Sequence, residues 1–133
     1  MSGWLFIDTS DRSRVRLAHL PEDGEIIEWV SEGLRQPFLE RLSAHISPEE
    51  IRELDGICVT AGPGSFSSIR SGVLVANLLS RLYSISLYGV SVEQSESLYG
   101  LRDMLRAHTI VPSEYIAPIY DAEPNITCSP LVS

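Results

Sequence analysis

The sequence predicts an α/β fold in which a three-stranded antiparallel meander is joined to parallel strands by helical crossovers. The first 30 residues contain three short strand-like runs with short connections, and only antiparallel neighbours can be joined so closely. Later in the chain, helix-like segments alternate with apolar strand-like runs, which is typical of parallel strands. A glycine turn, Gly-Pro-Gly at residues 62–64, stands between one such strand and a long apolar helix.

The meander is predicted from the amino-terminal third of the chain. Residues 4–7 are an apolar run that is typical of a buried strand, and the polar residues 8–11 end it. Residues 14–18 alternate between polar and apolar side chains, as a half-exposed strand does. Turn-forming residues follow at 21–24, and residues 25–30 are expected to form the third strand.

Two helices and a buried strand are predicted next. Residues 36–46 place apolar side chains on one face at helical spacing. Ser47 is a suitable N-cap, followed by proline and two acids, so a short helix is expected through Leu54. The apolar residues 56–59 form the strand that leads into the glycine turn.

The second half of the chain is predicted to add a long helix, another strand and a last helix. The long helix follows the glycine turn and runs to Leu82, and residues 85–90 form the strand. Ser91 is expected to cap the last helix. The apolar residues of that helix are Val92, Leu98, Leu101 and Leu105.

The composition is ordinary for a globular protein, but the charge is not balanced. The 133 residues suffice for one core, so we expect one domain over residues 1–107 and an extended tail over residues 108–133, which holds four of the eight prolines. The net charge is −8 and the isoelectric point is about 4.7. Such a surface repels phosphate backbones, so we expect no direct binding of nucleic acid by this chain alone.

The same features predict a cytoplasmic protein. The amino terminus has no basic stretch followed by an apolar one, and no apolar run approaches membrane-spanning length. Cys58 lies in the apolar strand and Cys128 in the tail, which favours a buried thiol and a surface thiol over a disulfide.

The order of elements matches the ribonuclease-H-like domain of the acetate kinase, sugar kinase and actin group. In that architecture, the end of the first strand and the loops after the later parallel strands line one edge of the sheet, which we call the ligand edge. Asp8, Thr9 and Ser10 stand at the end of the first strand. A phosphate loop needs glycine and usually a cation, but no glycine follows this strand until Gly24, and the nearest cations are Arg12 and Arg14. Turn formation is therefore favoured over nucleotide contact.

The sequence predicts no catalytic residue and no metal site. His19, His45 and His108 are separated, without the spacing of metal-binding motifs. Ser65 lies in GPGSF rather than in the GxSxG turn of hydrolases, and the loop lacks the lysine of a Walker A motif. The remaining alternative is a small nucleotide-binding or hydrolytic enzyme. It would use Asp8, Thr9, Ser10, Gly62, Gly64 and Ser65.

The long helix has more apolar surface than one sheet can cover. At about 100° per residue, Arg70, Asn77 and Arg81 form a narrow polar stripe. Nearly all other positions are apolar or small, whereas a surface helix needs an apolar stripe of only about 100°. A second apolar face predicts an interface, with the polar stripe at its rim. The apolar positions are Ile69, Val73, Leu74, Val75, Ala76, Leu78, Leu79, Leu82 and Tyr83.

The segment GPGSFSSIRSG resembles the GPGSFTGIRIG signature of the TsaB (YeaZ) family, the non-catalytic partner in bacterial tRNA threonylcarbamoyladenosine synthesis. The opening FIDTS and the segment YGVSVEQSESL are similar to other parts of that family, so the resemblance covers about residues 3–105. It implies an actin-like pseudo-enzyme that supports TsaD, the ATP-dependent catalytic subunit. The matching positions are Gly62, Pro63, Gly64, Ser65, Phe66, Ile69, Arg70 and Gly72.

The resemblance also implies partners and their site. The helix after GPGSF would pack on the matching helix of TsaD, the ATPase TsaE would bind the assembled pair, and ATP and metal would sit on TsaD rather than on this chain alone. Without TsaD, the helix over residues 66–82 would form a homodimer. The glycine turn would then fix the angle of an interface helix. The expected interface residues are Phe66, Ile69, Arg70, Val73, Leu74, Asn77, Leu78, Arg81 and Leu82.

The sequence departs from the family in two respects. Ser67 and Ser68 replace Thr-Gly, and Thr60 stands where the family often has glycine. The second domain of the family is absent, although residues 116–127 resemble the tail that follows it in some members. We therefore expect an unusually short form of a TsaB protein.

Overall fold

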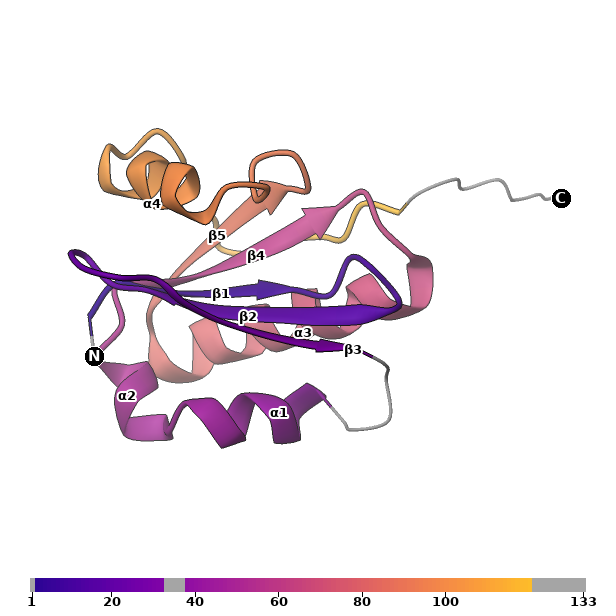
Figure 1. Cartoon of the computed structure of the whole chain (residues 1–133), viewed down its shortest axis with the longest axis horizontal. Coiled ribbons are helices and arrows are strands. Elements are labelled where there is room, and N and C mark those ends of the chain that lie inside the picture. Colours follow the sequence, from indigo (N-terminus) through magenta and orange to yellow (C-terminus); the bar gives the residue numbers. More distant parts are fainter. Residues whose placement is uncertain (1, 33–37, 121–133) are drawn as a thin grey trace, which may run out of the picture.

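The computed structural model describes residues 2–32 and 38–120, which build a five-stranded mixed sheet with helices on both faces (Figure 1). The strand order is β3-β2-β1-β4-β5. β1 pairs antiparallel with β2 and β2 with β3, whereas β1–β4 and β4–β5 are parallel. This is the predicted meander joined to parallel strands. The strands are β1 (Trp4–Asp8), β2 (Arg14–Leu20), β3 (Ile27–Glu32), β4 (Gly56–Gly62) and β5 (Ser86–Ser91).

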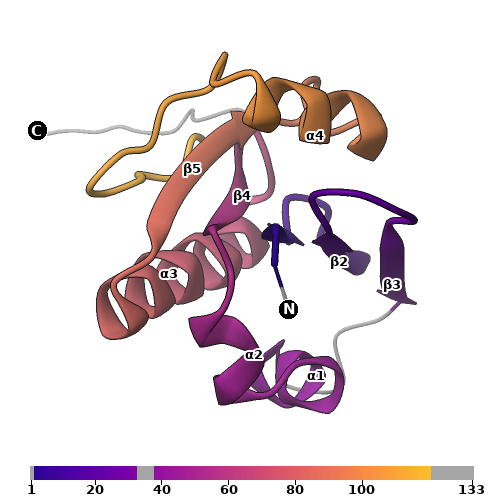
Figure 2. The ribbon, with the colours of Figure 1, turned by 90° about the vertical axis from the view of Figure 1, so that its left-hand side faces the viewer.

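The helices divide the core into two halves. α1 (Phe38–His45), α2 (Pro48–Arg52) and α3 (Phe66–Tyr83) cover one face of the sheet, and α4 (Leu98–Arg106) covers the other (Figures 1 and 2). Side chains of a strand alternate between the faces, so Leu5 and Ile7 of β1 pack with α3 while Phe6 packs with α4. All of β1 is buried, as the central strand of such a sheet should be.

Three predicted boundaries are wrong. The third strand begins at Ile27 instead of residue 25, and the N–H of Ile26 donates to the hydroxyl of Tyr99 on α4. The last helix begins at Leu98 rather than just after Ser91. Ser91 and Gln94 instead cap each other reciprocally in a separate turn, and Ser97 caps α4. The short helix also ends at Arg52 rather than at Leu54.

The described part of the predicted tail lies along β5 and α3. We call residues 109–120 the C-terminal segment (Figure 2). The N–H of Ser113 donates to the carbonyl of Leu87 (2.7 Å), and the N–H of Ile119 donates to that of Ala61 (2.7 Å). The amide of Asn77 donates to the carbonyl of Ile116 and accepts from its N–H, both at 2.9 Å. Main-chain and side-chain hydrogen bonds therefore hold a segment that has no helix or strand period.

Candidate functional site

The glycine turn is packed against other parts of the same chain. Gly62 has φ +135°, and a Cβ on it would collide with the carbonyl oxygen of Ile119. A Cβ on Gly64 would lie 2.8 Å from the carbonyl oxygen of Ser10 and 2.9 Å from a methyl group of Ile69. Only glycine fits such close approaches. The turn therefore joins the C-terminal segment, the end of β1 and α3.

The backbone amides of the turn are engaged within the chain. The N–H of Gly64 donates to Ile119 (3.2 Å), and the N–H of Ser65 donates to the carbonyl of Ser10 (3.1 Å). An anion cradle requires such amides to point at a ligand. Here both amides donate to carbonyl groups of the chain itself.

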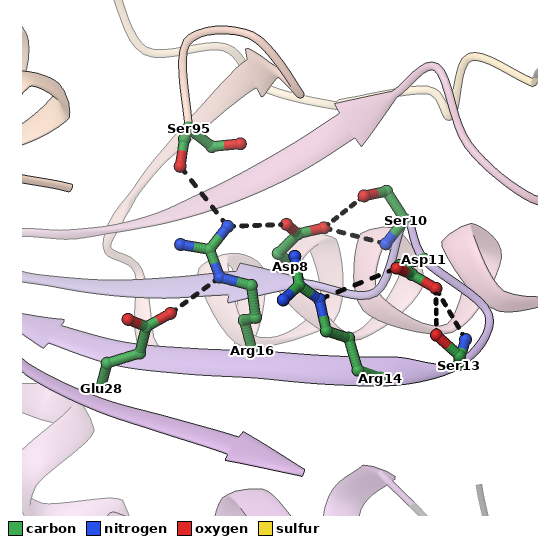
Figure 3. Close-up of polar contacts among 8 residues, drawn as sticks. All are labelled: Asp8, Ser10, Asp11, Ser13, Arg14, Arg16, Glu28 and Ser95. Carbon is green, nitrogen blue, oxygen red and sulfur yellow. Dashed lines mark hydrogen bonds and ion pairs between the residues drawn. The ribbon is translucent and has the colours of Figure 1, made fainter. Parts of the chain in front are cut away.

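Asp8 at the ligand edge is held by its neighbours (Figure 3). Its Oδ1 accepts from the N–H (2.9 Å) and the hydroxyl (2.6 Å) of Ser10. Its Oδ2 forms an ion pair with Arg16 at 3.3 Å, and Arg16 also pairs with Glu28 at 2.7 Å. The guanidinium further donates to the carbonyl of Ser95 (3.5 Å). Both oxygens of the Asp8 carboxylate are thus bound, and the cation that pairs with this carboxylate is the side chain of Arg16.

A cleft of about 480 Å³ opens over this ion pair, and its charges are mixed. Hydrogen bonds from the hydroxyl and the backbone of Ser13 lower the pKa of Asp11, so this carboxylate stays ionised at the cleft rim. Polyphosphates would meet several carboxylates here. The lining residues are Asp8, Ser10, Asp11, Arg14, Arg16, Glu28, Val30, Val92, Ser95 and Glu96.

The predicted nucleotide-contact residues Asp8, Thr9, Ser10, Gly64 and Ser65 all form hydrogen bonds within the chain. Asp8 and Ser10 line the cleft, whereas Thr9 is buried, and its Oγ1 accepts from the N–H of Gly72 (3.1 Å). Within residues 2–32 and 38–120, no group of three His, Cys, Asp or Glu side chains is arranged to hold a metal ion. In the same ranges, no helix has both the length and the hydrophobicity to cross a bilayer.

The sequence reasoning missed Arg16, which dominates this edge. Arg16 lies directly opposite Asp8 in the β1–β2 ladder. The polar positions of the alternating run at 14–18 were the available signal. Only the register of the two strands reveals the pairing, and register requires the turn geometry.

Helix α3 has the two faces that its sequence predicts. Ile69 and Val73 are buried, with 0% and 2% of their surface exposed. Leu74, Leu78 and Leu82 are exposed at 68%, 56% and 66%. These three residues, each four positions from the next, form what we call the leucine stripe. The second apolar face is therefore on the surface of this chain.

The structure corrects part of the predicted interface. Ile69 and Val73 face the sheet, because their positions on the helix lie opposite to the outward arc. Asn77 is partly buried and hydrogen-bonded to Ile116, so it orders the C-terminal segment. Arg70 and Arg81 are exposed together with the leucine stripe. The side chain of Phe66 lies outside the described part of the chain.

The apolar surface continues from α3 onto the C-terminal segment. A groove of about 230 Å³ lies between them, next to Leu74. Tyr115 and Ile119 of the segment are exposed at 68% and 57%. The groove is lined by Arg70, Val73, Leu74, Asn77, Tyr115, Pro118 and Tyr120.

Comparisons with known proteins agree with this architecture. Residues 38–103 match the family model of TsaD, described as tRNA N6-adenosine threonylcarbamoyltransferase. The structure is similar to YeaZ from Pseudomonas aeruginosa, with a TM-score of 0.57 and 23% identity over 66% of this chain and 42% of that chain. A second match is an uncharacterized protein with similarity to peptidase YEAZ from Pseudomonas aeruginosa, with a TM-score of 0.55 and 24% identity over 68% and 44%. No curated protein matches the sequence.

These similarities confirm the predicted fold class, the ribonuclease-H-like, actin-type α/β fold. The chain spans less than half the length of the two solved chains that it resembles.

Proposed function

Starting from the resemblance of this chain to the TsaB (YeaZ) family in its loop motif and fold, we propose that it is a non-catalytic scaffold and activator of TsaD. In this role it binds TsaD through α3 and supports threonylcarbamoylation of the adenosine next to the anticodon in tRNA. ATP and metal then belong to TsaD, and TsaE docks on the assembled pair. Such a pair works in the cytoplasm.

The leucine stripe is the observation that carries the proposal. Its three leucines are each more than half exposed and lie on one face of an 18-residue helix. Burying such a side chain yields roughly 1.5–3 kcal/mol, so the stripe can contribute several kcal/mol to an interface. The stripe is also next to the groove beside the C-terminal segment, which gives a partner a concave as well as a convex surface.

The interactions within the ligand edge also support a non-catalytic role. The Asp8 carboxylate is bound by Ser10 and Arg16, and the amides of Gly64 and Ser65 are bound by carbonyls. A nucleotide would have to break these interactions before gaining its own. The activity therefore requires a second subunit in this proposal.

The match to the TsaD family favours a second candidate, in which this chain is itself a transferase or a nucleotide-binding enzyme. This candidate requires ATP binding or turnover by the chain alone. Isothermal titration with ATP and Mg²⁺, without TsaD, separates the two functions. Our proposal expects no heat of binding. Binding of ATP to the unaltered chain that is lost in Asp8→Asn would establish the alternative.

The proposal itself is tested by copurification with TsaD of the same organism and by a reconstituted tRNA modification assay. Leu78→Asp places a charge in the middle of the leucine stripe and should abolish both copurification and modification. Leu39→Asp on α1 is the matched control, since Leu39 is 54% exposed against 56% for Leu78. Normal binding and activity of Leu78→Asp would refute the proposal, as would equal losses in both variants.

A further inference from the structure

The C-terminal segment lies beside α3 along most of the helix. Near the carboxyl end of α3, Glu114 of the segment and Ser80 of the helix line the same cleft. In the middle of the helix, Asn77 is hydrogen-bonded to Ile116. Before the amino end of the helix, Tyr120 pairs with the glycine turn. The segment and the helix therefore run antiparallel, and a partner that binds the exposed face of α3 meets the segment as well.

Exposure alternates from one residue to the next in the second half of the segment. Tyr115, Ala117 and Ile119 are exposed, and each is followed by a partly buried residue. Such alternation is that of an extended chain that lies on a surface. The inward residues Ile116 and Tyr120 pack against the core beneath α3. The three exposed residues, which we call the outward row, are apolar too, so this segment has two apolar faces, as α3 does.

The backbone that carries the outward row is held in place by the rest of the chain. The Asn77 amide binds both backbone groups of Ile116 at 2.9 Å, and the N–H of Ile119 donates to the carbonyl of Ala61 at 2.7 Å. Gly89 leaves room for the Ile116 side chain, because a Cβ on Gly89 would lie 2.6 Å from its terminal methyl group. The outward row is therefore positioned before a partner binds, which lowers the entropic cost of binding.

The outward row adjoins the leucine stripe. The groove of about 230 Å³ between α3 and the segment is lined by Leu74 of the stripe and by Tyr115 of the row. Both residues are 68% exposed. Pockets for small molecules have volumes of roughly 300–1,000 Å³, so this groove fits an apolar side chain of a protein partner better than a small molecule. The stripe and the row therefore form one continuous apolar surface with a groove between them.

We propose that the C-terminal segment forms the second half of the interface with TsaD. An apolar helix of TsaD lies along the seam between the leucine stripe and the outward row, with one apolar side chain in the groove. Asn77 is a positioning residue in this arrangement, because it acts on the partner through the segment. The inference rests on the proposed function, and it extends the interface from one helix to two elements of the chain.

Isothermal titration calorimetry of the full chain with TsaD of the same organism tests the proposal. The double variant Tyr115→Ser with Ile119→Ser should bind about thirtyfold more weakly, because a few large side chains dominate the affinity of an interface. Val111→Ser is the matched control. Val111 is 70% exposed and belongs to the same segment, but it follows Ile110, which packs on the α4 side of the core. Equal affinity of the double variant and the unaltered chain would overturn the proposal, as would an equal loss in the control.

Asn77→Ala tests whether Asn77 acts through the segment. It should speed hydrogen exchange at the amide of Ile116 and weaken TsaD binding about tenfold, because the segment must then be ordered on binding. In a chain that already carries Tyr115→Ser and Ile119→Ser, the same change should weaken binding by less than about threefold, since the side chains that Asn77 positions are gone. Equal factors in both backgrounds would overturn the positioning role.

Leu78→Asp separates failure of this proposal from failure of the proposed function. Loss of TsaD binding in Leu78→Asp, with normal binding of the double variant in the outward row, would confine the interface to α3 and overturn this inference alone. Absence of TsaD binding by the unaltered chain would overturn both. If the double variant dissociated a homodimer of the isolated chain without changing the affinity for TsaD, the outward row would be a contact between two copies, and this inference would again be wrong.

Discussion

The ligand edge and the outward face of α3 satisfy their side chains in opposite ways. At the ligand edge, Asp8, Ser10, Arg16 and Glu28 bind one another, and the amides of the glycine turn bind carbonyls of the chain. On α3, three leucines remain exposed although the helix already contributes Ile69 and Val73 to the core. The polar side chains of the ligand edge thus have partners within the chain, whereas the exposed leucines of α3 form the surface at which we propose that a partner binds.

The two faces of α3 give the largest expected difference. Val73→Asp buries an unpaired charge against the sheet and should cost about 3–5 kcal/mol, enough to unfold a marginally stable domain. Leu78→Asp exchanges one exposed side chain for another and should leave the free energy of unfolding within about 0.5 kcal/mol. Urea denaturation followed by circular dichroism compares them. Similar losses in both variants would mean that Leu78 is not on a free surface.

Removal of one charge should show that the ligand edge is complete by itself. Arg16→Met leaves the Asp8 carboxylate without its cation in a largely buried position and should cost about 3 kcal/mol. Adding Asp8→Asn removes the uncompensated charge and should restore a large part of that loss. Chemical denaturation of the two single variants and the double variant gives the coupling. If the losses of stability in the two single variants added up in the double variant, Asp8 and Arg16 would not interact as a close pair.

The glycine turn connects the two regions. Two glycine substitutions separate the effect of its packing on stability from the effect of its backbone conformation. Gly62→Ala meets both a positive φ of 135° and the carbonyl of Ile119. Gly24→Ala has a positive φ of 101° with no atom within 4 Å. We expect a loss of about 1 kcal/mol for Gly24→Ala and at least twice that for Gly62→Ala, measured by thermal unfolding. Equal losses would show that the contact with the C-terminal segment is loose.

The last effect concerns pH and the core between the sheet and α4, in which Cys58 lies. Burial raises the pKa of the Cys58 thiol above its ordinary value, so the folded state keeps a proton that the unfolded state releases. The contribution to stability is intact below the unfolded pKa of about 8.5 and falls as the pH rises above it, by up to about 1.4 kcal/mol per unit. Cys58→Ala should flatten this part of the pH profile of unfolding. If the slope of unfolding free energy against pH did not change in Cys58→Ala, a group other than Cys58 would be responsible for it.

Features that depend on the repeat of apolar residues could be predicted from the sequence. Features that depend on which residues of two strands pair could not. The meander, the parallel strands and the two apolar faces of α3 follow from repeats of two and of about 3.6 residues. The Asp8–Arg16 pair depends on which residues of β1 and β2 are opposite, and no period gives that.

Local hydrogen bonding decided the remaining differences. Ser91 has the chemistry of an N-cap, but it caps a single turn with Gln94, and Ser97 begins α4. The C-terminal segment has no apolar repeat, and Asn77 holds it through the two backbone groups of Ile116. A single side chain with such a role has no signature in the surrounding sequence.

The most direct test of the central claim is the affinity of TsaD for variants of the two regions. Isothermal titration calorimetry should show that Leu78→Asp weakens TsaD binding by about a hundredfold or more, as truncation or charging of an interface anchor does. Asp11→Asn, which removes an exposed carboxylate from the cleft of the ligand edge, should leave the affinity unchanged. Unaltered affinity of Leu78→Asp, with a loss in Asp11→Asn, would contradict the account.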